Sequence, residues 1–266
     1  MQELKDRVAI ISGGGSGIGR GSALAFARAG MKVLVADIAA ERAEAVANEI
    51  RTAGGQAHSI CCDVTQERDI LALRDMALEQ FGAIHLVMNN VAVLPSGKFQ
   101  EVPLSEWQRA FEVNLLSCVR IIQILLPELQ KSGEGHIVNT ASTAGLYPYT
   151  ADRLPYSSTK AALISLSECL SLDLRPQNIG ITCLCPGPVR TNIIEQMKFH
   201  GAKPVFKTPE LALLDPEDVG EMVVKAVREN TFLLLTHPQV QDILRRRADD
   251  PEKFLEQQIL TVNNSV

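Results

Sequence analysis

The sequence has no uninterrupted apolar run of about 18 to 20 residues, the length that spans a bilayer. Its N-terminus also lacks the basic stretch, apolar core and cleavage site of a secretory signal. We therefore expect no membrane partner and a cytoplasmic location.

An excess of positive charge is missing as well. The 26 Lys and Arg residues are outnumbered by 31 Asp and Glu residues, which gives a net charge of −5. Because a phosphate backbone selects a basic surface, we expect no nucleic acid as a main partner. The one dense basic run, residues 245–247, precedes Asp249 and Asp250 and is expected to be a solvated helix face.

The six cysteines do not follow the pattern of a metal site. Cys61-Cys62 and Cys183-x-Cys185 lie on expected strands and lack the CxxC spacing and histidine pattern typical of zinc. We expect no metal. We also expect the cysteines to be small buried side chains in a reducing compartment.

Short β-branched apolar segments alternate along the chain with longer amphipathic stretches. Continuous apolar runs such as residues 33–36 indicate strands that are buried on both faces, as in a parallel sheet covered by helices. We therefore expect an α/β fold, a doubly wound parallel sheet of about seven strands with helices on both faces. The expected strands lie near residues 7–12, 32–37, 56–61, 84–89, 135–141, 179–184 and 232–236.

No linker or change of composition divides the chain, so we expect a single domain over residues 1–266 with a Rossmann-like core at 5–236. The connection at 187–215 is long for a compact domain and is expected to form a substrate lid. The tail at 238–266 is expected to be helical. It could pack on its own subunit or on a neighbour.

The segment from Ser12 to Gly19 joins the first expected strand to the first expected helix. Its glycines permit positive φ and close approach of a ligand, and the start of the helix favours a pyrophosphate. The spacing is GxxxGxG, through Gly13, Gly17 and Gly19, and not the GxGxxG of the usual dinucleotide fold. The alternative is a flexible turn that binds nothing.

Asp37 ends the second expected strand. A carboxylate there can accept hydrogen bonds from an adenosine ribose and repel a 2′-phosphate, which favours NAD over NADP. Asp37 could instead cap the helix that follows. Arg20 and Arg42 are close enough in sequence to meet a 2′-phosphate if either folds towards that pocket.

Tyr156 and Lys160 share one face of a long helical stretch that runs to about Leu174. A free tyrosine has a pKa of about 10, and a neighbouring ammonium lowers that pKa by favouring the phenolate. The pair can therefore act as an acid–base device. Two ordinary residues on an amphipathic helix would give the same pattern.

Together these motifs resemble those of the short-chain dehydrogenase/reductase family, in the family's order and approximate spacing, from Gly13 to Thr191. Ser12 stands where Thr is commoner, and Asp63-Val64 matches the family's Asp at the adenine end. Ala92 replaces a glycine in the segment after the fourth strand. Between Ser142 and Tyr156, the charged pair Asp152-Arg153 suggests a lengthened loop over the active site.

The resemblance implies a catalytic set of Asn114, Ser142, Tyr156 and Lys160. Tyr156 would exchange the hydroxyl proton and Ser142 would hydrogen-bond the substrate oxygen, while Lys160 binds the nicotinamide ribose and Asn114 holds a water. The residues implied for cofactor binding are Ser12, Gly13, Gly15, Ser16, Gly17, Ile18, Gly19, Asp37, Ile38, Cys62, Asp63, Val64, Asn90, Val91, Ala92, Tyr156, Lys160, Pro186, Gly187, Val189 and Thr191.

The implied activity is an NAD-dependent interconversion of a secondary alcohol and a ketone. The candidate wall residues are mostly apolar, so we expect a hydrophobic, alicyclic or aromatic substrate and not a sugar. These residues are Val93, Leu94, Leu146, Tyr147, Tyr149, Leu154, Ile193, Ile194, Met197, Phe199 and Phe206. His200 is a further candidate contact.

Three alternatives remain at this stage. One is an NADPH-linked 3-ketoacyl carrier-type reductase, which Asp37 disfavours, and another is an epimerase or dehydratase on the same fold. The third is a dinucleotide-binding regulator without catalysis, which the complete catalytic set disfavours. The family usually forms homodimers or homotetramers through two long helices, here about 105–130 and 154–176.

Overall fold

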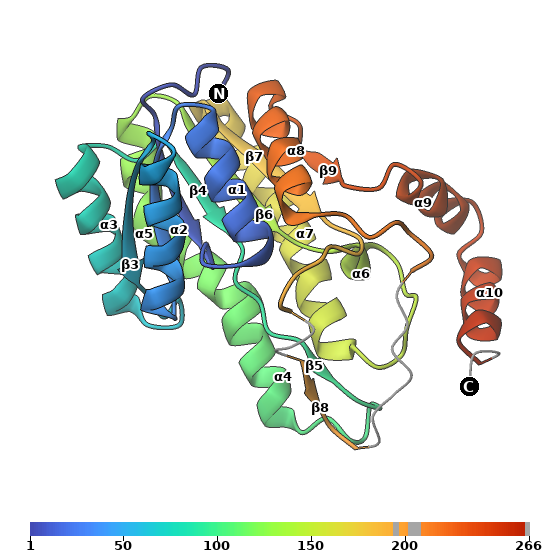
Figure 1. Ribbon diagram of the computed structural model, residues 1–266. Helices are drawn as coiled ribbons and strands as arrows, with labels where there is room; N and C mark the ends of the chain where they lie inside the picture. Colours follow the sequence, from blue (N-terminus) through green and yellow to red (C-terminus); the bar gives the residue numbers. More distant parts are fainter. Residues whose placement is uncertain (194–196, 202–208, 264–266) are drawn as a thin grey trace.

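A computed structural model describes residues 1–193, 197–201 and 209–263 (Figure 1). Seven strands form one parallel sheet in the order β3-β2-β1-β4-β6-β7-β9. The predicted doubly wound parallel sheet is therefore confirmed. The strands are β1 (Val8–Ser12), β2 (Lys32–Asp37), β3 (Gln56–Cys61), β4 (Leu86–Asn89), β6 (Gly135–Thr140), β7 (Ile179–Cys185) and β9 (Leu233–Leu235).

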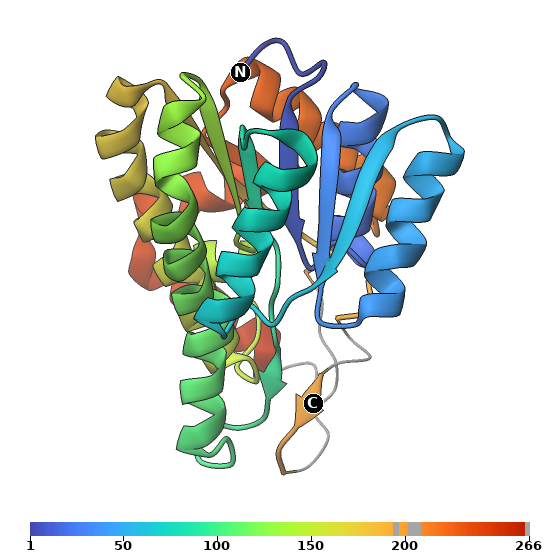
Figure 2. The same cartoon turned by 90° about the vertical axis from the view of Figure 1, so that its left-hand side faces the viewer.

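Helices cover both faces of the sheet, because the strands carry apolar side chains on each side. One face packs against α1 (Gly17–Arg28), α2 (Ala40–Thr52) and α8 (Pro216–Glu229). The other packs against α3 (Glu67–Phe81), α5 (Ser117–Lys131) and α7 (Leu154–Leu174). Figure 2 shows α3 and α5 in front of the sheet.

Shorter elements surround the carboxyl ends of the strands. They are α4 (Leu104–Phe111), the π-helical turn η1 (Glu112–Leu116) and α6 (Thr143–Leu146). The 3-10 turn η2 (Arg175–Gln177) lies instead between the end of α7 and the start of β7. A second small sheet pairs β5 (Pro95–Ser96) with β8 (Lys198–Phe199). The predicted 187–215 connection thus contributes one strand to a ribbon beside the sheet's carboxyl end.

The continuous helical stretch Leu104–Lys131 bears on the expectation that the chain has no membrane-spanning segment. Its most apolar window has a mean hydropathy of 1.5, so by length and composition alone it could cross a membrane. Charged side chains interrupt it, which is why the sequence shows no long apolar run. Its apolar residues Ile121, Ile122, Leu125 and Leu129 are buried in the core against the sheet. Core helices pass the same test, so the stretch is weak evidence for a membrane span.

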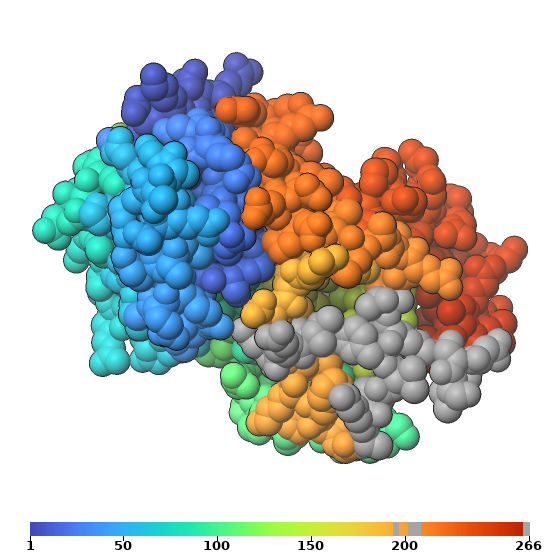
Figure 3. Space-filling model, viewed as in Figure 1, coloured from blue at the N-terminus to red at the C-terminus, as the bar shows by residue number. Residues whose placement is uncertain are grey.

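The tail forms α9 (Val240–Asp249) and α10 (Pro251–Asn263), which stand out from the body in Figure 3. Val240 and Phe254 are buried in one cluster with Tyr147, and Arg247 donates to the carbonyl oxygen of Leu146. The tail therefore rests on its own chain beside α6. The arginines at 245–247 are exposed, as predicted.

The expectation of buried cysteines holds for four of the six. Cys61 and Cys169 are exposed, because Cys61 ends the edge strand β3 and Cys169 lies on the outer side of α7. The thiols of Cys183 and Cys185 lie 3.9 Å apart in the core. Within the described ranges, no group of three His, Cys, Asp or Glu residues could hold a metal ion.

Candidate functional site

The strand order changes direction beside β1, which has β2 on one side and β4 on the other. Loops that leave the carboxyl ends of β1 and β4 diverge there, and such a crevice is the usual ligand site of an open α/β sheet. A cleft of about 510 Å³ lies at this point. Of the predicted cofactor residues, the cleft is lined by Gly13, Ser16, Gly17, Ile18, Asp37, Ile38, Cys62, Asp63, Val64, Asn90, Val91, Ala92, Tyr156, Lys160, Pro186, Gly187, Val189 and Thr191.

The three remaining predicted residues, Ser12, Gly15 and Gly19, do not line the cleft but shape its glycine turn. Gly13 and Gly17 have φ of 63° and 52°, the left-handed region that favours glycine. A Cβ on Gly19 would lie 2.1 Å from the carbonyl oxygen of Gly13. The turn is therefore tightly folded against the start of α1 and is not a loose glycine-rich loop.

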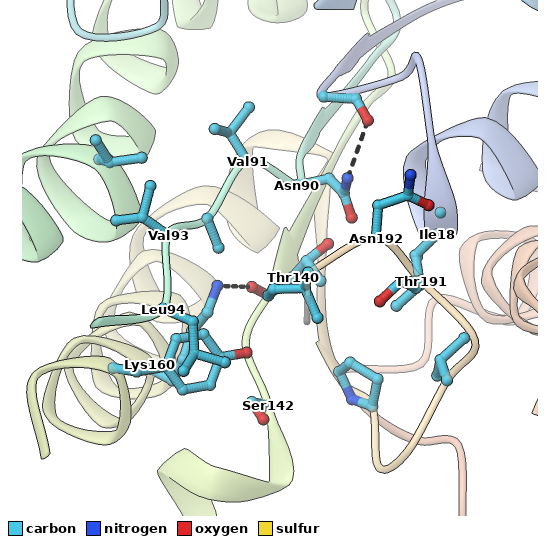
Figure 4. A pocket seen from close by; sticks show the side chains of 18 of the residues that line it. Ile18, Asn90, Val91, Val93, Leu94, Thr140, Ser142, Lys160, Thr191 and Asn192 are labelled. Carbon is cyan, nitrogen blue, oxygen red and sulfur yellow. Dashed lines mark hydrogen bonds between the residues drawn. The ribbon is translucent and has the colours of Figure 1, made fainter. Parts of the chain in front are cut away.

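Hydrogen bonds join the two loops on either side of the crevice. Ser12 Oγ donates to the carbonyl oxygen of Met88 at 3.0 Å and accepts from the Asn90 N–H at 3.2 Å. Asn90 Nδ2 donates in turn to the Gly13 carbonyl oxygen at 3.3 Å (Figure 4). The serine that replaces the family's threonine thus ties the end of β1 to the end of β4.

Asp37 is 6% exposed and accepts three hydrogen bonds. They come from the Gly15 N–H at 3.1 Å, the Ala39 N–H at 3.0 Å and Arg42 Nη2 at 3.1 Å. The residue at the N-cap of α2 is Ala39, so the alternative that Asp37 caps this helix is wrong. Asp37 instead holds the glycine turn and Arg42 at one end of the cleft.

Of the two arginines near this end, only Arg42 lines the cleft. Arg20 pairs with Glu49 at 2.7 Å and Glu217 at 3.1 Å. These contacts direct Arg20 away from the pocket. Asp63, also at this end, accepts from the N–H and hydroxyl of Thr65 at 2.9 and 2.8 Å, which orders the loop after β3.

Tyr156 and Lys160 lie on α7 and both line the cleft, as their helical spacing predicts. They lie on the β6 side of the cleft, at the opposite end from Asp37 on β2. Lys160 Nζ donates to the Thr140 carbonyl oxygen at 2.6 Å (Figure 4). The same atom lies 5.6 Å from the centroid of the Tyr156 ring. Lys160 is therefore positioned by the end of β6 next to the tyrosine.

The pKa of Tyr156 differs from the sequence expectation. Burial raises this pKa to about 12, and a hydrogen bond with Ser142 only partly opposes the rise. Burial also lowers the pKa of Lys160 to about 8. The predicted depression of the tyrosine pKa is thus wrong for the protein without ligand, because desolvation of the phenolate outweighs nearby positive charge.

Ser142 lines the cleft beside Tyr156 and is 6% exposed. It is the N-cap of α6, and its Oγ accepts from the Ala144 N–H at 3.1 Å. A serine hydroxyl carries one donor besides its acceptor lone pairs. Ser142 is therefore fixed through its acceptor side, and its hydroxyl also hydrogen-bonds Tyr156, which lowers the pKa of the tyrosine.

Asn114 is fully buried in the π-helical turn and does not itself line the cleft. Its Oδ1 accepts from the Val93 N–H at 2.8 Å. Its Nδ2 donates to the Val93 carbonyl oxygen and to Thr159 Oγ1, both at 3.0 Å. Asn114 therefore fixes the backbone of Val93, which does line the cleft, against α7.

The predicted substrate wall is only partly correct. Val93, Leu94, Tyr149 and Ile193 line the cleft. Met197 and Phe199 pack around Leu94 and Tyr156 behind it. Leu146 and Tyr147 pack against the tail instead. Leu154 and His200 are not in the lining, and Ile194 and Phe206 lie outside the described residues.

Sequence reasoning missed several residues of the lining. These are Thr65, Arg109, Val113, Thr140, Ala141, Thr143, Arg153, Pro188, Asn192, Pro209 and Leu213. A signal existed for Arg153, since Asp152-Arg153 is a charged pair just before the helix that carries Tyr156. Both residues are buried, at 8% and 5% exposed, so the segment that was predicted as a lengthened loop over the active site is packed into the protein.

The fold and the cleft together define a doubly wound α/β protein with a ligand cleft at the carboxyl ends of its strands, lined at one end by Tyr156 and Lys160. The chain matches the short chain dehydrogenase family over residues 7–200. It belongs to this family.

Two curated relatives and one solved structure illustrate the similarity. The 7alpha-hydroxysteroid dehydrogenase of Escherichia coli strain K12 is 34% identical over 82% of this chain and 85% of that protein. The cyclohexanol dehydrogenase of Acinetobacter sp. strain SE19 is 33% identical over 90% and 95%. A short chain dehydrogenase/reductase from Burkholderia phymatum in complex with NAD superimposes with a TM-score of 0.86, at 32% identity, over 95% of this chain and 96% of that one.

Proposed function

We propose that the chain is an NAD-dependent oxidoreductase that interconverts a secondary alcohol and a ketone, with Tyr156 as the acid–base residue. The observation that carries the proposal is the placement of Tyr156, Ser142 and Lys160 at one end of a cleft whose other end holds the glycine turn and Asp37. Acid–base and binding groups thus lie in one continuous site.

The site fits a dinucleotide. Two glycines with positive φ and the N-terminus of α1 border the cleft, and a Cβ on Gly17 would lie 3.0 Å from the Thr191 side chain. Such a turn and helix end suit a pyrophosphate. Gly13, Gly17, Asp37 and Asp63 would hold the adenosine and pyrophosphate, and Thr191 and Lys160 the nicotinamide half. Bound NAD would supply the hydride acceptor.

Asp37 favours NAD over NADP. Its carboxylate is buried and already bonded to Gly15 and Arg42. A 2′-phosphate at this end would meet that negative charge, and the cation of Arg42 is matched by Asp37.

The proton chemistry follows from the three residues at the other end. During alcohol oxidation Tyr156 accepts the hydroxyl proton, and during ketone reduction it returns that proton. Ser142 donates a hydrogen bond to the substrate oxygen and stabilises negative charge as it develops. Lys160, held by the Thr140 carbonyl, keeps a positive charge beside the tyrosine. Asn114 fixes the Val93 backbone. We propose that Asn114 also holds the water that the family resemblance implies.

The substrate would be a hydrophobic, alicyclic or aromatic secondary alcohol or its ketone. Apolar side chains surround Tyr156, among them Leu94, Met197 and Ile193. The names of the relatives, a hydroxysteroid and a cyclohexanol dehydrogenase, support a ring-bearing alcohol. The connection at 187–215 would act as a lid over this end, within a single domain that includes the tail.

Self-association is a further part of the proposal. Leu116 on the π-helical turn and Leu172 on α7 are 44% and 82% exposed, on the two long helices that were predicted to pair. A homodimer or homotetramer would cover such side chains. Light scattering after size-exclusion chromatography would measure the assembly. The cytoplasmic location stays a prediction from the sequence.

The decisive experiment is a screen of ring-bearing secondary alcohols with NAD and NADP, followed at the absorbance of the reduced nicotinamide. Wild-type protein should reduce NAD with at least one of them, while Tyr156→Phe should still bind NAD but give no turnover. NAD binding without any turnover by the wild type would favour the regulator. Turnover with NADPH on ketoacyl thioesters alone would favour the carrier-type reductase.

A further inference from the structure

Two buried polar residues, Thr236 and His237, follow the edge strand β9 and precede the tail. They are 4% and 3% exposed, and neither lines the cleft. Their side chains nevertheless bond to the 187–215 connection at two places, one at its start and one near its end. Thr236 and His237 therefore hold both ends of the connection from behind the cleft.

A chain of hydrogen bonds runs through this pair. Thr236 Oγ1 accepts from the Gly187 N–H at 3.1 Å and lies 2.8 Å from His237 Nδ1. His237 Nε2 lies 2.7 Å from the carbonyl oxygen of Ala212. Because a carbonyl oxygen can only accept, Nε2 carries a hydrogen and donates it. In the neutral ring Nδ1 then accepts from the Thr236 hydroxyl, so the two ring nitrogens have opposite roles.

The first contact reaches one of the proposed cofactor residues. Gly187 lines the cleft, as do its neighbours Pro186 and Pro188. A Cβ on Gly187 would lie 2.6 Å from His237 Nδ1 and 2.8 Å from Cε1 of the same ring. The imidazole therefore packs directly against the Gly187 backbone, an approach that leaves no room for a side chain at this position. Thr236 and His237 thus fix a wall of the cofactor site.

The second contact fixes the returning part of the connection. Ala212 stands between Leu213, which lines the cleft, and Leu211. Leu211 packs in one cluster with Tyr149, and Tyr149 also packs against the cluster that contains Tyr156. The imidazole bond to Ala212 therefore positions a segment that flanks the proposed substrate wall.

Backbone hydrogen bonds join the two ends of the connection to each other beside this pair. The Arg190 N–H donates to the carbonyl oxygen of Leu214 at 2.9 Å, and the Leu214 N–H donates to the carbonyl oxygen of Pro188 at 3.1 Å. The two ends thus form a paired base, with Thr236 bonded to one side and His237 to the other. A change in the imidazole would reach both sides of this base.

We propose that His237 is a positioning residue that couples the cofactor wall at Gly187 to the substrate wall at Ala212, with Thr236 as its link to the first. The substrate part of this inference rests on the proposed dehydrogenase function. The two links differ in chemistry, since Nδ1 accepts a hydrogen bond and Nε2 donates one. Each link can therefore be removed without the other.

Binding of NAD tests the link through Thr236. Thr236→Val keeps the shape of the side chain but removes the acceptor for the Gly187 N–H. Calorimetry should show NAD bound roughly three- to tenfold more weakly by this variant than by the wild type, the effect of one lost hydrogen bond. His58→Gln on β3, at the opposite edge of the sheet, is the control and should bind NAD as the wild type does.

Binding of a ketone tests the link to Ala212. The probe is cyclohexanone with NAD present, a pair that cannot react because both molecules are oxidised. His237→Gln places an amide N–H near the position of Nε2, whereas the shorter side chain of His237→Asn offers an acceptor near Nδ1 but does not reach Ala212. Cyclohexanone should bind roughly three- to tenfold more weakly to His237→Asn, and nearly as in the wild type to His237→Gln.

Turnover separates positioning from a general loss of stability. With cyclohexanol and saturating NAD, His237→Asn should raise KM while kcat stays nearly unchanged, because the groups that exchange the proton are intact. His237→Gln should restore KM. Urea unfolding would measure the stability of both variants, and a merely structural role would lower that stability without separating their values of KM.

The two ideas fail in different ways. Equal cyclohexanone affinity in His237→Asn and His237→Gln, or unchanged NAD affinity in Thr236→Val, would overturn the coupling and leave the dehydrogenase intact if alcohols are oxidised. The expected differences in binding, found without oxidation of any alcohol, would overturn the dehydrogenase and retain the positioning role of His237.

Discussion

Lys160 Nζ lies 2.6 Å from the carbonyl oxygen of Thr140, the last residue of β6. This bond joins α7, the helix that carries Tyr156, to the carboxyl end of the sheet. Lys160 is 1% exposed, so its ammonium is held by the backbone and not by solvent. The position of the Lys160 ammonium is therefore set by the fold before any ligand binds.

Replacement of this ammonium should harm catalysis more than folding. Lys160→Met keeps an apolar stem of similar length but removes the charge and the bond to Thr140. We expect kcat/KM for alcohol oxidation to fall by roughly a hundredfold or more, with a raised KM for NAD. Steady-state kinetics would measure both. Lys225→Met on the exposed side of α8 is the matched control and should behave like the wild type; equal kinetics for the two variants would exclude Lys160 from the reaction.

The pKa of Tyr156 predicts opposite pH dependences for the two directions. With this pKa raised to about 12, the phenol stays protonated between about pH 6 and 8, the range in which Lys160, whose pKa is lowered to about 8, keeps its positive charge. Oxidation needs the phenolate, so its kcat/KM should rise with pH, approaching tenfold per unit. Reduction needs the phenol, so its kcat/KM should stay nearly level over the same range. A pH-rate profile in each direction with one alcohol and its ketone checks this, and an oxidation rate that does not change with pH would contradict it.

Asp37 and Arg42 predict how nucleotide preference can be altered. Asp37→Ala removes the carboxylate that lies 3.1 Å from the Arg42 guanidinium and so frees that cation for a 2′-phosphate. The ratio of kcat/KM with NADP to kcat/KM with NAD should rise by at least roughly tenfold. The double variant Asp37→Ala, Arg42→Ala should lose most of the gain in NADP use. An unchanged preference in the single variant would leave Asp37 as a support for the glycine turn alone.

Burial of His136 should make the free energy of unfolding depend on pH. Burial, with smaller effects from the N-terminal ammonium and Arg175, lowers its pKa from the ordinary 6.5 to about 3. Since the unfolded chain then binds a proton that the folded chain does not, the free energy of unfolding falls as pH drops from about 6.5 towards about 3. The loss from this group is at most roughly 1.4 kcal/mol per pH unit.

Urea unfolding at pH 6.5 and pH 5 would measure this loss for the wild type and for His136→Gln. The variant should lose less stability on acidification, even if it is less stable at pH 7, because the bond to Thr182 at 2.9 Å is disturbed. His58→Gln, on the half-buried strand β3, is the control. If His136→Gln loses as much free energy of unfolding between pH 6.5 and pH 5 as the wild type does, groups other than His136 cause the loss.

Periodicity and spacing were sufficient for the sheet and for the motifs. Runs of buried residues define the strands, and the strand–turn–helix order places Gly13, Asp37 and Tyr156 at one edge of a parallel sheet, as observed. These features depend on local sequence and on a fold rule.

Other features depend on contacts between distant segments. The burial of Arg153 comes from packing by Tyr149 and from Asp152, which is itself tied to Ser96. The pKa of Tyr156 reflects the depth of its burial, which a helical i to i+4 pattern does not specify. In both cases local sequence identifies the residue but not its surroundings.

The contact between the tail and α6 has a consequence for selectivity. Leu146 and Tyr147 directly follow the turn that begins at Ser142, and they rest on Val240, Phe254 and Arg247. The two tail helices are therefore a second place, remote in sequence from every catalytic motif, where substitutions can tune the active site. Directed evolution of this protein should include α9 and α10 in its libraries as well as the walls of the cleft.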